Sequence, residues 1–154
     1  HKMPAITSPS TLEAFLENRI KVLLEAQLTK IPDANILTGH TIEDDGLDQE
    51  APVVIVTATR EEEDIPGTGW WITSIEVELD PRDLDDNSIE SICNKIETAI
   101  GDGSNDIETQ LSNGRLKCMT GSVFYDQSFD YDPSDSERSM FFKFSGSFGL
   151  LAPS

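Results

Sequence analysis

Apolar residues recur at helical spacing in the first part of the chain and form one stripe. Its members are Leu12, Phe15, Leu16, Ile20, Leu23, Leu24 and Leu28. This period predicts an amphipathic helix. Ser10 and Glu13 match a capping box, in which two side chains satisfy free backbone N–H groups where a helix begins. Because a residue before proline avoids the helical region, we expect Ile31-Pro32 to end this helix.

The period changes to two in the middle of the chain, where a hairpin is predicted. Val53 to Val56 is a continuous β-branched run, typical of a strand covered on both faces. Further on, apolar and polar positions alternate, which indicates a half-exposed strand. Its inward positions are Trp71, Thr73, Ile75, Val77 and Leu79. Arg60–Gly69 between the strands is rich in acidic residues and glycine, so we expect an acidic loop at the hairpin tip.

A second amphipathic helix is predicted from Ser88 to Ile100. Its apolar face consists of Ile89, Ile92, Cys93, Ile96, Ala99 and Ile100. The acidic residues of Asp80–Asn87 suit the positive end of the helix dipole, and Gly101 is placed to cap the other end. Residues 105–111 favour a short helical turn.

Two more strands are predicted in the last part of the chain, over Leu116–Tyr125 and Ser139–Leu151. The second places Met140, Phe142, Phe144, Phe148 and Leu150 on one face. The acidic segments 33–50, 60–69 and 126–137 show no periodicity and are expected to be loops. The first of these loops is expected to contain a short irregular strand around Asn35–Thr38. These elements predict a single α+β domain over residues 11–151. Its sheet is mainly antiparallel with four strands, and two amphipathic helices pack on one face.

Composition narrows the possible partners. The chain has 154 residues, a net charge of −18 and 37% hydrophobic residues. Such an acidic protein is not expected to bind nucleic acid or anionic membranes, which need clustered Lys and Arg. No apolar run reaches the ~20 residues of a membrane span, and no secretory leader is expected. His1-Lys2-Met3 is interpreted as a tag remnant, and residues 1–10 as a flexible N-terminus.

The residue types that are commonly catalytic or metal-binding in proteins form no recognisable site in this sequence. Cys93 and Cys118 are expected to be small buried hydrophobes in a reducing compartment. His40 has no partner at ligand spacing, so neither a metal site nor acid–base catalysis is predicted. Carboxylates in the 126–137 loop could converge on calcium, but the glycine of an EF-hand loop is absent. They are Asp130, Asp132, Asp135 and Glu137.

We therefore predict a protein that is not an enzyme and uses no cofactor. A calcium-dependent binding module that uses the acidic loops is the alternative function. An enzyme that uses paired carboxylates is the third hypothesis.

Trp70 and Trp71 are the candidate contact residues of the hairpin. Neighbours on a strand point to opposite faces, so Trp71 continues the inward pattern and Trp70 points outward near the acidic tip. Trp70 either packs beneath a loop or anchors a subunit interface, where exposed tryptophan is a frequent hot spot. Phe124, Phe129, Tyr131 and Phe141 could extend such a surface.

The layout as a whole resembles the bacteriophage tail terminator (tail completion) proteins, including minor tail and head–tail joining members. The resemblance rests on the N-terminal helix, the strand Pro52-Val-Val-Ile-Val with its acidic hairpin, and the strand Trp70–Leu79. The helix Ser88–Ile100 and the final strand around Arg138-Ser-Met-Phe-Phe-Lys-Phe complete it. It covers the chain from about Leu12 to Leu151.

This resemblance implies a structural virion assembly protein without catalytic residues. Members form a hexameric ring that caps the tail tube and joins it to the head connector protein. The implied partners are further copies of the chain, the tail tube protein and the head connector protein. DNA passes through the ring without being specifically bound, and an acidic lumen would repel its phosphates. The implied location is the tail or neck of the virion, with assembly in the host cytoplasm.

A cyclic ring needs two different patches on each subunit, meeting head to tail. On one side we expect Trp70 with Arg60, Glu61, Glu62 and Glu63. On the other side we expect the 126–137 loop, with Phe129 and Tyr131. The like-charged tips must be kept apart or paired with basic residues, for which the candidates are Arg19, Lys21, Arg82 and Lys95.

Overall fold

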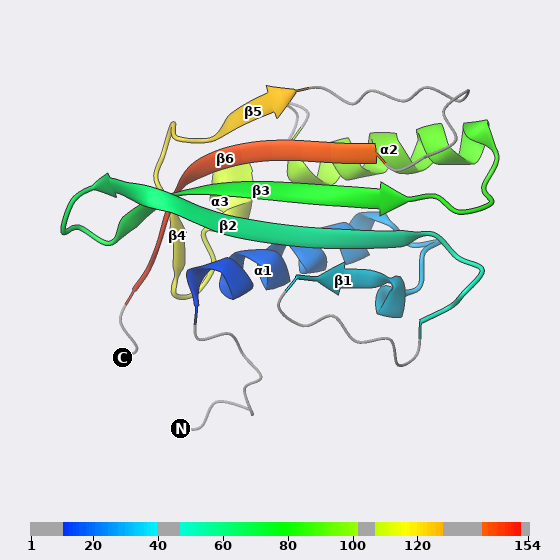
Figure 1. The fold of residues 1–154 in the computed structure, drawn as a ribbon, viewed down its shortest axis with the longest axis horizontal. Coiled ribbons are helices and arrows are strands. Elements are labelled where there is room, and N and C mark those ends of the chain that lie inside the picture. The colour runs from blue at the N-terminus through cyan, green and yellow to red at the C-terminus, as the bar shows by residue number, and fades with distance from the viewer. Residues whose placement is uncertain (1–10, 40–46, 102–106, 128–139, 152–154) are drawn as a thin grey trace.

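The computed structural model describes residues 11–39, 47–101, 107–127 and 140–151. The helices within this part are α1 (Leu12–Gln27), α2 (Asp86–Ile100) and α3 (Ile107–Leu111), and a 3₁₀ turn, η1 (Asp33–Asn35), precedes the first strand. The strands are β1 (Ile36–Thr38), β2 (Val53–Ile65), β3 (Trp70–Asp80), β4 (Leu116–Cys118), β5 (Phe124–Gln127) and β6 (Met140–Leu150). They form one six-stranded sheet with the helices on one face (Figure 1), so the predicted α+β class is confirmed.

The sheet is mixed rather than purely antiparallel. Its strand order is β1-β2-β3-β6-β4, and β5 also pairs with β6. β1 runs parallel to β2, and the other pairs are antiparallel. β4 and β5 share the outer edge of β6, where Cys118 lies opposite Phe148 and Phe124 lies opposite Ser145.

The expected four-stranded sheet was therefore wrong in two places. The sequence prediction left β1 outside the sheet, although a short strand was expected there. It also treated Leu116–Tyr125 as one strand, whereas a turn at Met119–Ser122 divides it. Gly121, with a φ of 80°, permits that turn, and Ser122 N–H donates to Met119 O at 3.1 Å.

The core lies between the helices and the inward side chains of the three long strands. Cross-strand rows such as Val56–Val77–Phe142 and Ala58–Ile75–Phe144 run across β2, β3 and β6. The predicted helix stripes pack against them, with Leu16, Ile20, Leu24, Ile89 and Ile96 fully buried. The inward faces predicted for both helices, for β3 and for β6 are thus confirmed.

The helix ends depart from the sequence prediction at α1 and at the start of α2, which begins at Asp86 rather than Ser88, and agree with it at the end of α2. Thr11, not Ser10, is the N-cap of α1, and its Oγ1 accepts from Ala14 N–H at 3.3 Å. α1 ends at Gln27, before Ile31-Pro32, and its C-cap residue Leu28 leaves helical geometry with a ψ of 62° and is buried. Gly101 caps α2 with a φ of 114°.

Gly101 also has a steric role. A Cβ at this position would lie 1.8 Å from Tyr125 Oη, whose hydroxyl donates to Ile100 O at 2.7 Å. The end of α2 is thereby tied to β5. A side chain at Gly101 would both strain the backbone and displace Tyr125.

Glu17 is the main core residue that the sequence pattern did not reveal. It lies on the buried side of α1 with no exposed surface, and its Oε2 accepts from Ala58 N–H of β2 at 2.8 Å. β1 covers the edge of β2 only as far as Val56. Glu17 therefore satisfies the next edge N–H group, which is buried away from water.

We expect Glu17→Ala to lower the free energy of unfolding by about 1–3 kcal/mol, because it leaves Ala58 N–H buried without an acceptor. Glu17→Gln keeps an acceptor oxygen and should cost clearly less. Denaturant unfolding measures both. Equal losses for the two variants would contradict this account of Glu17.

Both cysteines are free and buried, as predicted. Cys93 Sγ lies 3.6 Å from Met140 Sδ and so joins α2 to β6. Burial, with smaller contributions from Glu97 and Glu90, raises the pKa of the Cys93 thiol to about 12. The neutral thiol is therefore the form that the folded protein holds.

We expect Cys93 to resist thiol-specific disulfide reagents in the folded protein at mildly alkaline pH and to react on unfolding. The unfolded thiol ionises near ~8.5, below its folded pKa of about 12. Its contribution to stability is thus complete below ~8.5 and is lost as pH rises toward the folded value. Reaction kinetics of Cys118→Ala, which isolates Cys93, measure this. Rapid native modification would contradict the burial of Cys93.

Candidate functional site

The hairpin of β2 and β3 projects past the helices at one end of the molecule (Figure 1). β2 continues to Ile65 and β3 begins at Trp70, so the connecting turn is only residues 66–69. The prediction of an acidic loop over 60–69 was therefore wrong. Pairing with β3 overrides the weak strand propensity of the glutamates, and register shifts after Arg60 and after Glu63 accommodate the extra residues of β2.

The tip of this hairpin has a defined shape. Thr68 donates to Ile65 O twice, from N–H at 3.1 Å and from Oγ1 at 2.6 Å. Gly69 N–H donates to Glu63 Oε2 at 3.1 Å. Gly67 and Gly69 both have positive φ, which the turn requires. A tip held by its own hydrogen bonds loses little freedom when it meets a partner.

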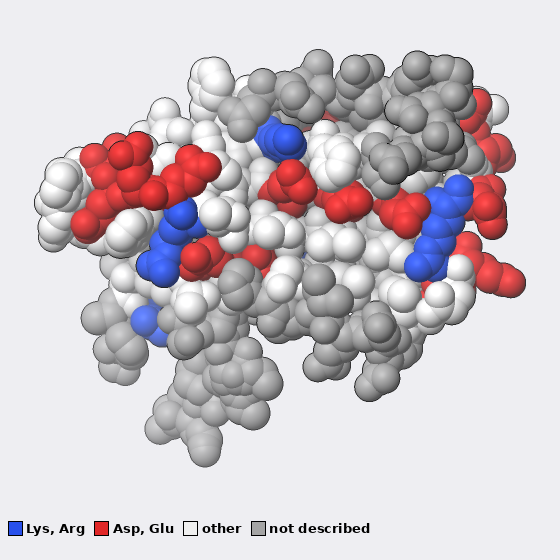
Figure 2. Space-filling view, viewed as in Figure 1, with Lys and Arg blue, Asp and Glu red and all other residues white. Residues whose placement is uncertain are grey.

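Acidic side chains gather on the projecting hairpin (Figure 2). Glu61, Glu62 and Asp64 are exposed, and Glu63 is half-buried. Glu61 Oε1 accepts from Ser74 Oγ at 2.8 Å across the hairpin. Of the four predicted interface residues in this stretch, three are these glutamates of β2. The fourth, Arg60, contacts residues of its own chain.

Arg60 holds the base of the hairpin to the rest of the molecule. Its Nε lies 3.0 Å from Glu13 Oε1 of α1, an ion pair whose geometry is not that of a hydrogen bond. Its guanidinium carbon lies 5.1 Å from the ring centroid of Trp71. Arg60 is therefore engaged within its own chain on two sides.

The two tryptophans lie on opposite faces of β3, but neither is fully exposed. Trp71 packs against the core, while Trp70 is half-buried on the other face. A Cβ on Gly149 would lie 3.6 Å from Trp70 Cε3, so Trp70 packs across the sheet on this glycine. Trp70 therefore packs against a strand of its own chain rather than beneath a loop, and its role in a subunit interface stays a prediction.

The sheet face away from the helices carries polar and charged side chains. Among the described residues, no helix covers this face (Figure 1). Thr57, Glu76 and Lys143 lie in one cross-strand row, with Thr59, Ser74 and Ser145 in the next. A shallow hollow of about 410 Å³ lies over these rows. Its only cation, Lys143, is 3.8 Å from Glu76 Oε2.

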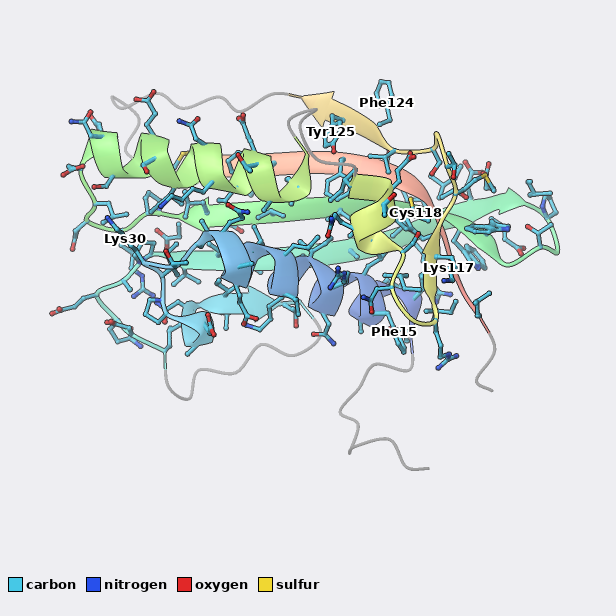
Figure 3. All side chains as sticks on the ribbon, turned by 180° about the vertical axis from the view of Figure 1, so that it is seen from behind. Phe15, Lys30, Lys117, Cys118, Phe124 and Tyr125 are labelled. Carbon is cyan, nitrogen blue, oxygen red and sulfur yellow. The ribbon has the colours of Figure 1, made fainter. Side chains whose placement is uncertain are left out.

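Aromatic residues are exposed on β5 and β6. Phe124 is 67% exposed, with Tyr125 and Phe141 partly so. Figure 3 shows Phe124 pointing away from the sheet and Tyr125 turned toward the helices. Tyr125 packs on Phe144 with ring centroids 5.7 Å apart. Phe129 and Tyr131, predicted for the second contact patch, lie outside the described residues, as do His40 and the carboxylates weighed for calcium.

A second hollow, of about 320 Å³, lies between the end of α1 and the start of α2. Its apolar lining is Leu28, Ile31, Pro52, Leu84 and Ile92, and its polar rim includes Lys30 and Lys95. Figure 3 places Lys30 at the end of the molecule away from the hairpin. The sequence pattern did not reveal this hollow, although Lys95 was a candidate partner for the acidic tips.

The described residues offer no group of three or more His, Cys, Asp or Glu that could hold a metal ion. Within the same ranges, no helix is both long and apolar enough to cross a bilayer. No protein-family model and no curated protein matches the chain.

We expect Arg60→Gln to lower the free energy of unfolding by about 1 kcal/mol, because it removes both the ion pair with Glu13 and the contact with Trp71. Amide hydrogen exchange of the hairpin should also speed up. Lys143→Gln, which removes an exposed pair on the same sheet, is the control. Equal effects of the two changes would contradict a special role for Arg60.

Proposed function

We propose that this protein is a structural subunit of a phage tail or neck that assembles head to tail into a closed ring, as a tail terminator. The observation that carries the proposal is the stiff β2–β3 hairpin, which projects beyond the helices with exposed Ile65 at its end (Figure 1). A hairpin whose tip is held by its own hydrogen bonds can enter a partner with little loss of conformational freedom.

The geometry favours a head-to-tail contact over a symmetric one. The hairpin is at one end of the molecule and the Lys30 hollow at the other (Figure 3). A contact between two different patches repeats from copy to copy and closes into a ring when the rotation permits. A hexamer is the ring size that the resemblance to tail terminators implies.

The charge of the chain suits a ring through which DNA passes. The net charge is −18, and acidic side chains cover the hairpin (Figure 2). Carboxylates that face a channel repel the phosphate backbone and so reduce sticking of the DNA. In this proposal the ring contacts the tail tube protein and the head connector protein, and it acts without catalysis.

We expect the purified protein to form rings of six copies, or to form them on the ends of tail tubes. Sedimentation gives the mass, and negative-stain images give the shape. The measurement is repeated with a chelator, which should change nothing. A chain that stays monomeric alone and leaves tube ends uncapped would contradict the proposal. A monomer whose stability falls on chelation would favour the calcium-dependent module instead.

A further inference from the structure

The end of the hairpin presents an apolar side chain among carboxylates. Ile65 is 49% exposed although it is a strand residue paired with Trp70. Glu62 and Asp64 beside it are exposed. Thr68 bonds twice to Ile65 O, so the backbone at Ile65 is fixed. An exposed aliphatic residue on a preorganised acidic tip is suited to enter an apolar hollow with a basic rim.

The hollow at the opposite end has that chemistry. Its wall is formed by Leu28, Ile31 and Ile92, with Leu84 and Pro52 beside them. Its volume of about 320 Å³ is ample for one branched aliphatic side chain and part of its turn. Asp85, the acidic residue on the rim, already accepts from Ser88 N–H at 2.7 Å as the cap of α2.

The basic residues of the chain are not equally available to an acidic partner. Arg19 donates to Gln110 O, and Arg82 donates to Asp48 O. Lys21 pairs with Glu25 at 3.1 Å and also donates to backbone carbonyls. Within the described ranges, neither Lys30 nor Lys95 makes an ion pair. In a chain with a net charge of −18, the hollow thus offers two lysines to carboxylates from outside.

A chain cannot fill this hollow with its own hairpin, because the two lie at opposite ends of the molecule (Figure 3). A hairpin that fills the hollow is therefore the hairpin of another copy. A second copy of this chain carries both features that the hollow fits, an aliphatic tip and flanking carboxylates.

We infer that Ile65 of one copy inserts into the hollow between α1 and α2 of the next copy, with Glu62 and Asp64 facing Lys30 and Lys95. This inference rests on the proposed head-to-tail assembly and names its contact. Within its own chain, Arg60 braces the hairpin through its contacts with Glu13 and Trp71. These contacts keep the tip in the fixed position that the contact between copies needs.

The test uses one variant for each side of the contact. Ile65→Ser removes the aliphatic tip, and the double variant Lys30→Glu/Lys95→Glu reverses the charge of the rim. Each is expected to weaken self-association at least about tenfold, measured by sedimentation across a range of concentrations. Thermal unfolding checks that both remain folded. Val22→Ser, an equally exposed aliphatic residue on α1, and Lys143→Glu are the matched controls and should assemble like the original chain.

Two further arms separate a direct contact from an indirect effect. Adding Glu62→Lys/Asp64→Lys to the rim variant should restore assembly, because the charges are exchanged across the same contact. Mixing the Ile65→Ser chain with the Lys30→Glu/Lys95→Glu chain should give heterodimers with one copy of each variant. No larger assembly should form, because each variant keeps only one side of the contact. One member of such a pair has an intact hollow and the other an intact tip.

The outcomes distinguish this inference from the proposed function. Loss of assembly by both variants, rescue by charge exchange and capped pairs on mixing support the inference. Rings that form normally from both variants would overturn it and leave the proposed ring standing. A binding partner other than a second copy is indicated if the original chain never self-associates, and that result overturns the inference and counts against a ring.

Discussion

One requirement governs this molecule: the inner face of β2, β3 and β6 must be shielded from water by α1 and α2. Rows such as Ala58–Ile75–Phe144 give the three strands a largely apolar inner side. The apolar stripes of the two helices pack against this side, and burial of each large side chain stabilises the fold by about 1.5–3 kcal/mol. With the helices committed to one face, the polar outer face and the hairpin are left for contact with other molecules.

The outer sides of the long strands β2 and β6 are covered by short strands and single side chains. On the β2 side, Glu17 continues the hydrogen bonding where β1 stops. On the β6 side, two short strands share one edge, and Ser147 N–H donates to Ser122 Oγ in the gap between them. Beyond Arg60 the hairpin edge is broken by register shifts, which discourage indiscriminate strand pairing. These edges therefore offer few free backbone groups for strand pairing with another chain.

The parts of the fold that depend on periodicity could be predicted from sequence, and the parts that depend on pairing partners could not. The stripe of α1, the inward side of β3 and the cap at Gly101 follow from local pattern. Strand structure in Arg60–Ile65 depends on β3 lying beside it, since glutamates alone favour no strand. The buried role of Glu17 and the hollow near Lys30 could not be predicted from local pattern, because both bring together segments that are distant in sequence. For the candidate site, the acidic hairpin was foreseen, but its tip residue Ile65 was not.

The position of β6 has a consequence for how the chain reaches this structure. β6 is the last strand along the described chain, yet it lies between β3 and the β4–β5 edge. On this side of β3, Val77 pairs with Phe142, which lies far along the sequence. Forming this pair closes a long loop, which is slow. Until β6 arrives, β3 has an unpaired edge and Val77 and Ile75 lack their cover. A newly made chain is thus most exposed to misassociation just before β6 joins the sheet, and the projecting hairpin is held on a completed sheet only after that step.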